Sequence, residues 1–153
     1  MKLSNNKQEK GRNRKGIVAL EFAIAAPLLI VMTLGLFQLG YAFLMYNELR
    51  NAVMDGARYA SISDYLPGST QMADAATNVV LYGTPTVPVS GSTLVYGLTA
   101  DKVSVSVAEF DGSGIPLYVD VSISGVDLGA LWPMTLTGKP KMSMRYMGQY
   151  VGE

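Results

Sequence analysis

An almost unbroken apolar run near the N-terminus limits what this chain can fold into more than any other feature. From Ile17 to Gln38 the only strongly polar side chain is Glu21, and apolar residues remain frequent as far as Tyr46. The 22 residues from Ile17 to Gln38 would extend about 33 Å as a helix, enough to cross a hydrocarbon core of about 30 Å. The run therefore predicts a membrane-spanning helix over residues 17–46.

Basic residues are concentrated immediately before this run. Residues 1–16 contain six bases and one acid, a net charge of +5, whereas residues 17–153 contain the other six bases and eleven acids, a net charge of −5. Positively charged flanks of a membrane helix stay in the cytoplasm. We therefore expect residues 1–16 to be a cytoplasmic basic leader and the C-terminal part to lie on the far side of the membrane.

The apolar run has two other interpretations. It could be a cleaved secretory signal peptide, with Gly40-Tyr41-Ala42 as the cleavage site and Phe43 as the new N-terminus. The apolar region of such a peptide normally spans about 7 to 15 residues, which is shorter than this run. It could also be the core helix of a soluble protein, but that helix would have to be apolar on every face.

The composition argues against catalysis. The chain contains no cysteine and no histidine, which excludes disulfides, cysteine nucleophiles, histidine bases and the usual zinc ligand sets. The acids of the C-terminal third, Glu109, Asp111, Asp120 and Asp127, are spaced like strand and turn residues. We expect no catalytic residue, no bound metal and no cofactor.

Glu21 is the most informative residue, because a carboxylate in a membrane helix is costly and usually has a partner or a purpose. Gly16 lies at the boundary between the basic and apolar segments, where a residue without a side chain suits a protease that binds extended backbone. Cleavage after Gly16 would make Ile17 the new N-terminus, with a cationic amine four residues before Glu21. The amine of a neighbouring chain could then pair with Glu21. Alternatively, Glu21 reaches toward the cytoplasmic interface or is neutral in lipid.

The N-terminal strings resemble a known group. Gly16, four apolar residues and then Glu21-Phe22 resemble the class III or IVb prepilin processing site. More specifically, the chain resembles the TadE-like family of the tight-adherence (Flp) pilus systems. The resemblance rests on Lys15-Gly16-Ile17-Val18-Ala19-Leu20-Glu21-Phe22-Ala23, Ala26-Pro27-Leu28-Leu29, Asn51-Ala52, Asp55-Gly56-Ala57-Arg58-Tyr59-Ala60 and, loosely, Met142-Ser143-Met144-Arg145.

This resemblance implies a pseudopilin or minor pilin that a prepilin peptidase cleaves after Gly16. It implies a single-pass protein of the bacterial inner membrane, with its C-terminal domain in the periplasm. The partners it implies are membrane lipid, the peptidase, the major Flp pilin and other pilin-like subunits, and the inner-membrane assembly platform. No nucleic-acid partner is expected. Alternatives are a permanently anchored, non-pilin component of a secretion system and a domain released by ordinary signal peptidase.

We expect the helix to continue beyond the membrane over residues 47–62, with Tyr46, Leu49, Val53, Ala57 and Ala60 forming an apolar stripe. Gly56 within it suggests close backbone packing, either inside the domain or against another subunit. The candidates for subunit packing are Gly56, Ala57, Arg58 and Tyr59.

Residues 63–153 predict a small α+β outer domain. A second helix is expected over residues 70–82, with Ser69 as its cap and Gly83 as its end. Period-two alternation over residues 103–107, 117–123 and 142–146 predicts an antiparallel sheet with one buried face. Trp132 has two interpretations, an exposed anchor for a partner subunit or an aromatic in the core or at a sheet edge. The expected fold is a long helix packed on a second short helix and a small sheet, as in pilins.

Overall fold

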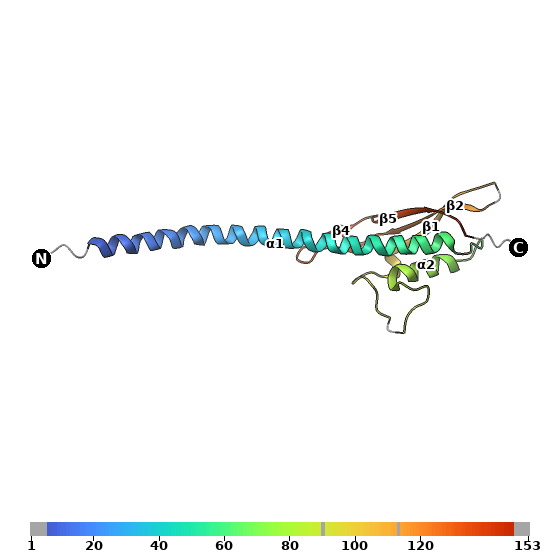
Figure 1. The fold of residues 1–153 in the computed structure, drawn as a ribbon, viewed down its shortest axis with the longest axis horizontal. Coiled ribbons are helices and arrows are strands. Elements are labelled where there is room, and N and C mark those ends of the chain that lie inside the picture. The colour runs from blue at the N-terminus through green and yellow to red at the C-terminus, as the bar shows by residue number, and fades with distance from the viewer. Residues whose placement is uncertain (1–5, 90, 113, 149–153) are drawn as a thin grey trace. The chain divides into compact units, whose positions relative to one another are not determined.

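A computed structural model describes residues 6–89, 91–112 and 114–148, with side chains described from residue 16 onward. The chain divides into two compact units, Met1–Gly40 and Tyr41–Glu153. The structure has the predicted fold class: a long apolar N-terminal helix, a second short helix and a small antiparallel sheet (Figure 1). The first five residues of the predicted basic leader lie outside the described residues.

The long helix α1 runs from Asn6 to Ile62 without interruption. Its backbone is already helical through residues 6–15, so the boundary between the basic and apolar segments is not a helix boundary. At its C-terminus, the hydroxyl groups of Ser61 and Ser63 donate hydrogen bonds of 2.8 and 2.7 Å to the carbonyl oxygens of Arg58 and Tyr59. These bonds satisfy carbonyls of the last turn and end the helix where the sequence predicts.

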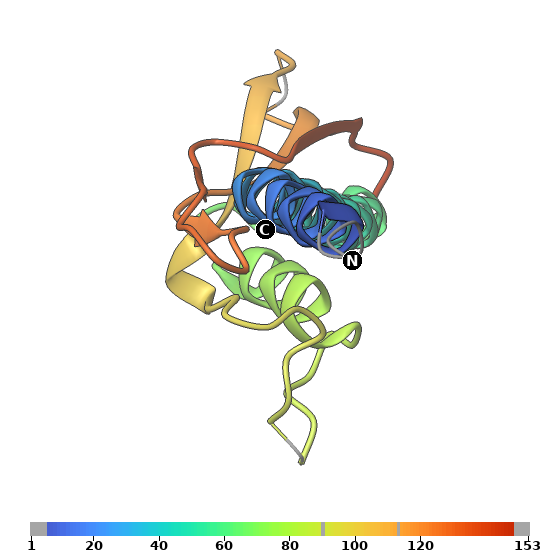
Figure 2. The same cartoon turned by 90° about the vertical axis from the view of Figure 1, so that its left-hand side faces the viewer.

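Helix α2 runs from Gln71 to Tyr82 and lies beside the last turns of α1 (Figures 1 and 2). The residue at the N-cap position is Thr70, which makes no side-chain capping bond there, and its hydroxyl instead bonds to Asp74 at 2.8 Å. Ser69 accepts a bond from the Gln71 amide at 3.2 Å, so the predicted cap contributes from one position earlier. Gly83 adopts the left-handed conformation and its amide bonds to the carbonyl oxygen of Val79, which ends the helix as expected.

The main sheet has the strand order β1-β2-β5, with both pairs antiparallel. Strand β1 spans Val103–Phe110, β2 spans Pro116–Ile123 and β5 spans Lys141–Arg145, and a short 3-10 helix, η1 (Ala100–Lys102), precedes β1. Val119 on the central strand faces Val107 on one side and Met144 on the other. The predicted alternation is therefore confirmed, since these residues share the inner face.

A second, two-stranded sheet was not predicted. It pairs β3 (Val126–Asp127) with β4 (Thr135–Leu136). Trp132 lies in the loop between these strands and is 54% exposed. Of its two interpretations, burial in the core is wrong, because the hairpin carries the residue out to the surface.

The core of the second unit is built from one face of α1 starting at Ala42, from α2 and from the inner face of the sheet. Figure 2 shows this part of α1 between the sheet and α2. All five residues of the predicted stripe belong to the core: Leu49, Val53, Ala57 and Ala60 are buried in it, and Tyr46 packs against it. The other buried members include Met45, Val80, Leu98, Val121, Ile123, Val126 and Tyr146.

Candidate functional site: the N-terminal helix and its junctions

The predicted processing site lies on the exposed surface of α1. Gly16 and Ile17 are both helical, and Ile17 is 58% exposed. A side chain added at Gly16 would meet nothing within 4 Å. A peptidase that binds extended backbone would therefore have to unwind this turn of the helix, but it would not have to displace any packed side chain.

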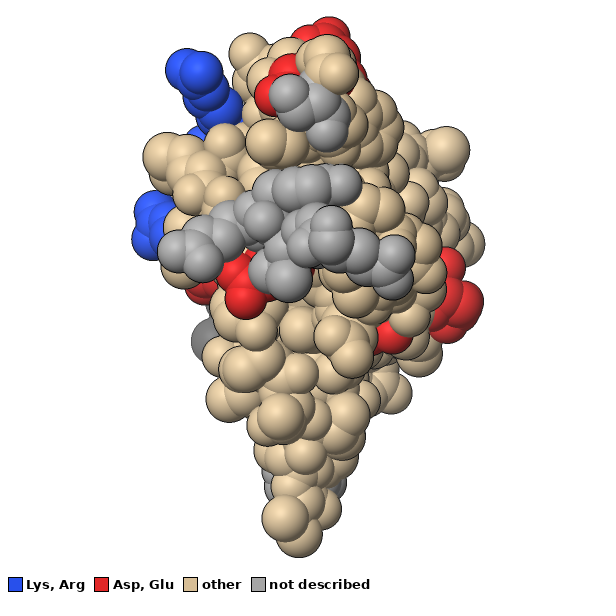
Figure 3. All heavy atoms as spheres, turned by 90° about the vertical axis from the view of Figure 1, so that its right-hand side faces the viewer, with Lys and Arg blue, Asp and Glu red and all other residues tan. Residues whose placement is uncertain are grey.

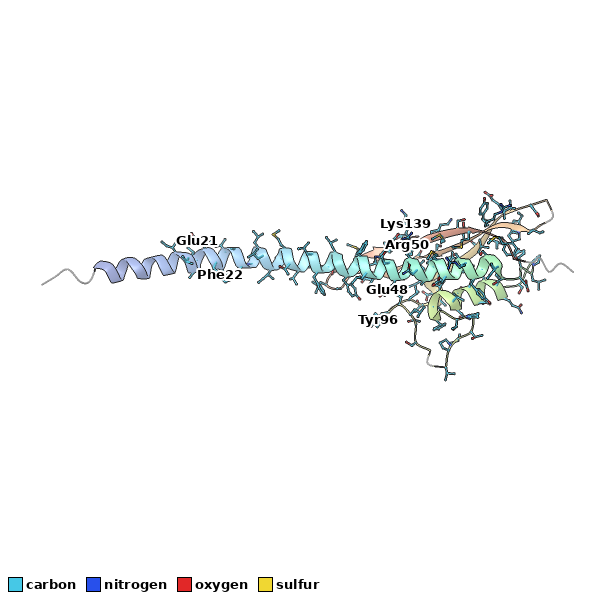
Figure 4. All side chains as sticks on the ribbon, in the orientation of Figure 1. Glu21, Phe22, Glu48, Arg50, Tyr96 and Lys139 are labelled. Carbon is cyan, nitrogen blue, oxygen red and sulfur yellow. The ribbon has the colours of Figure 1, made fainter. Side chains whose placement is uncertain are left out.

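Glu21 and Phe22 follow one turn later and are also exposed (Figure 4). Ile17 and Glu21 are four residues apart, so they lie on the same face of the helix, one turn above the other. A new amino group on Ile17 would therefore lie about one helical turn from the carboxylate of Glu21 in the same chain. Phe22, 69% exposed, extends from the adjacent face.

The helix surface beyond these residues is apolar and exposed. In the described part of the chain, α1 is the one helix long and apolar enough to cross a membrane, and no part of its most apolar window is buried in the structure. An apolar surface of this extent requires lipid or other apolar helices around it. Its large exposed side chains are Ile17, Val18, Leu20, Phe22, Ile24, Leu28, Leu29, Ile30, Val31, Met32, Leu34, Leu36, Phe37, Leu39, Phe43 and Leu44.

Two aromatic residues close to the end of the apolar run belong to the folded domain. Tyr41 and Tyr46 are each half-buried and pack against the core of the second unit. Ala42 and Met45 are buried in that core. The folded domain thus begins within the predicted span, and the fully exposed apolar surface is shorter than the apolar run.

The four candidates for subunit packing differ in their surroundings. Gly56 and Ala57 are buried within the chain's own core. A side chain at Gly56 would collide with Cγ2 of Val80 and lie 3.3 Å from the carbonyl oxygen of Ala76, so the glycine allows α1 and α2 to approach closely. Arg58 is exposed and Tyr59 half-buried. The close packing at Gly56 is therefore intramolecular, and only Arg58 and Tyr59 retain surface for contact with another subunit.

The surface of the second unit is sparsely charged in one region. Residues 75–100 contain no charged side chain. The connection from α2 to η1 projects away from the sheet, and its tip carries no Lys, Arg, Asp or Glu (Figures 1 and 3). Tyr96 in this connection is 88% exposed. Elsewhere on the face in Figure 3, acidic side chains are scattered rather than clustered.

An exposed apolar helix followed in the chain by a small α+β domain is typical of a membrane-anchored protein. Residues 16–58 match the family described as TadE-like protein, which confirms the resemblance drawn from the sequence. Over this segment, which covers most of α1, the chain is similar to that family. The match ends within α1. No curated protein and no solved structure matches the chain.

Proposed function

We propose that this chain is a pilin-like subunit, a pseudopilin or minor pilin, that takes part in assembling a Flp/Tad-type adhesion pilus. In this role α1 holds the chain in the inner membrane with its N-terminus in the cytoplasm, until prepilin peptidase cleaves after Gly16. The matured chain then associates with the assembly platform, the major Flp pilin and other pilin-like subunits through its apolar helix.

The observation that supports this proposal best is the exposed face carrying Ile17 and Glu21. The matched family segment starts at Gly16 and includes both residues. A carboxylate on an apolar helix surface in a membrane is costly and usually has a partner. The amine created by cleavage at Ile17 would supply one, and pairing between adjacent chains would fix the axial position of one helix against the next.

A substitution at Gly16 tests the proposed processing. Because a side chain there meets nothing within 4 Å, Gly16→Leu should leave the fold intact and affect only recognition by the peptidase. We expect the variant to keep its leader and to support no pili. Gly35→Leu is the matched control, since Gly35 is also helical with nothing within 4 Å of an added side chain, and it should be cleaved normally. Normal processing of Gly16→Leu would argue against the proposal.

A further inference from the structure

Three of the six basic residues that come after the basic leader line one cleft of the second unit. Residues 17–153 contain six bases, and three of them, Arg50, Lys139 and Lys141, line a cleft of about 240 Å³. Its other walls are formed by Tyr46, Val53, Pro140 and Met142. Residues 17–153 have a net charge of −5, so this cleft differs in sign of charge from the segment as a whole.

Two of the three cations have no partner in the described part of the chain. Lys141 forms an ion pair of 2.8 Å with Asp120, and the hydrogen bonds from Lys141 and Ser143 lower the pKa of that aspartate. The side chains of Arg50 and Lys139 form neither an ion pair nor a hydrogen bond within the described residues. The cleft therefore has cationic groups directed at an empty volume, a suitable arrangement for an incoming carboxylate.

A carboxylate is available on the opposite side of the same helix. Glu48 is exposed and makes no ion pair within the described residues. Residues two apart on an α-helix are separated by about 200° around the axis and about 3 Å along it. Figure 4 shows Glu48 and Arg50 leaving α1 on opposite sides, with Lys139 on the side of Arg50.

We propose that Glu48 of one copy of this chain binds the Arg50–Lys139 cleft of the next copy. The inference rests on the proposed function in one respect: copies anchored in one membrane stand parallel and at the same height. Because Glu48 and Arg50 differ by only about 3 Å along the helix, parallel neighbours bring these groups together with almost no axial shift.

This contact would join two different surfaces, the Glu48 side of one copy and the cleft of another. A contact of this kind leaves one free surface at each end of the pair, so further copies can add. An isologous contact, in which the same surface of both copies meets, would stop at two. The charge arrangement thus favours an extendable row of copies, as a fibre or its base requires.

Disulfide cross-linking in membranes can test this contact, because the chain contains no cysteine of its own. Asn51 lies one turn after Glu48, and Thr137 lies two residues before Lys139; both are exposed and uncharged. A full-length Asn51→Cys chain and a differently tagged full-length Thr137→Cys chain are expressed together and oxidised. The proposal predicts a mixed adduct of the two chains. A single chain carrying both substitutions should give a ladder of adducts larger than a dimer.

Charge reversal then tests whether the attraction of Glu48 to Arg50 and Lys139 produces the adduct. Adding Glu48→Lys to the Asn51→Cys chain should lower the adduct yield about fivefold, the effect of losing one exposed charge pair at the upper end of its usual range. Adding Arg50→Glu and Lys139→Glu to the Thr137→Cys chain should restore the yield. Glu109→Lys, an exposed substitution on β1, is the control in the first chain and should change nothing.

Three results would overturn the inference: no adduct between the unmodified pair, a yield indifferent to Glu48→Lys, or no recovery on double reversal. Failure of recovery would mean that the cleft takes another anion, such as a lipid phosphate. None of these results depends on where the leader is cut. If a chain that keeps its leader still forms the charge-dependent adduct, the contact between copies is supported and the proposed cleavage after Gly16 is refuted.

Discussion

The hydroxyl group of Tyr146 donates a hydrogen bond of 2.8 Å to the carbonyl oxygen of Ser63, joining the end of β5 to the end of α1. The next residue repeats the connection, since the amide of Met147 bonds to the carbonyl oxygen of Ser61 at 2.8 Å. Tyr146 also packs edge to face against Tyr65. The last strand therefore secures the C-terminus of the long helix to the domain.

Tyr146→Phe should lower the free energy of unfolding of the second unit by about 1 kcal/mol, because it removes a part-buried hydrogen bond and leaves the ring in place. Urea unfolding of the full chain in detergent, followed by near-ultraviolet circular dichroism, measures this loss. Burial raises the pKa of the Tyr146 hydroxyl above its ordinary value. The stability that the neutral hydroxyl contributes is therefore fully present at a pH below the ordinary tyrosine pKa, and it is lost as the pH rises through the raised pKa of the folded state. The comparison therefore belongs at neutral pH, where an unchanged stability would contradict the role of this bond.

Gly56→Ala should destabilise the domain although alanine is the better helix former. The gain in helix propensity is about 1 kcal/mol, whereas the added methyl group meets Val80 and the backbone of α2, an overpacking that typically costs about 1–3 kcal/mol. Thermal unfolding of the full chain in detergent should show a lower midpoint.

Val80→Ala provides the matched control for this steric argument. It should be destabilising alone, since Val80 is fully buried, but combined with Gly56→Ala it should cost clearly less than the sum of the two single changes. Additive losses would mean that the two residues do not compete for the same space.

Acid should loosen the loop between β3 and β4. Asp127 Oδ1 accepts hydrogen bonds from the amides of Gly129 and Met134 at 2.9 and 2.7 Å, and these bonds lower the pKa of its carboxyl group. A lowered pKa in the folded state means that the contribution is present above the ordinary aspartate value and is lost as the pH falls through the lowered one.

Trp132 is the one tryptophan of the chain and lies in this loop, so its fluorescence reports the transition. The emission should change with a midpoint below the ordinary aspartate pKa, and Asp127→Ala should already have the altered emission at neutral pH. If the Asp127→Ala emission still titrates like that of the native chain, another group controls the loop.

Glu21→Gln should prevent pilus assembly without removing the chain from the membrane. The amide has nearly the same shape but cannot form an ion pair with the amine of a neighbouring Ile17. Electron microscopy of the cell surface and membrane fractionation would measure the two effects separately. Pili in normal number with this variant would show that the ion pair is dispensable.

The sequence predicts those parts of the fold that have a repeating pattern. Alternation of apolar residues in the three long strands predicted their inner faces, and Gly83 predicted the end of α2. The strands β3 and β4 are two residues long, too short to show any period, so the sequence predicts no hairpin there and leaves the burial of Trp132 open. The proposed processing residues lie within one short string, so the sequence alone can predict them. The sequence could not predict the cationic cleft, because Arg50 on α1 and Lys139 beside β5 are far apart in the chain. Only the packing of the sheet on the helix brings these two residues together.

The identity of the mature N-terminal residue shows whether prepilin peptidase cleaves this chain after Gly16. The full chain is purified from membranes of cells with and without the prepilin peptidase, and its terminus is read by sequential degradation or by mass. We expect Ile17 when the peptidase is present and Met1 when it is absent. Met1 in both preparations would indicate a permanent anchor, and Phe43 would indicate release by ordinary signal peptidase; either result would contradict maturation by prepilin peptidase.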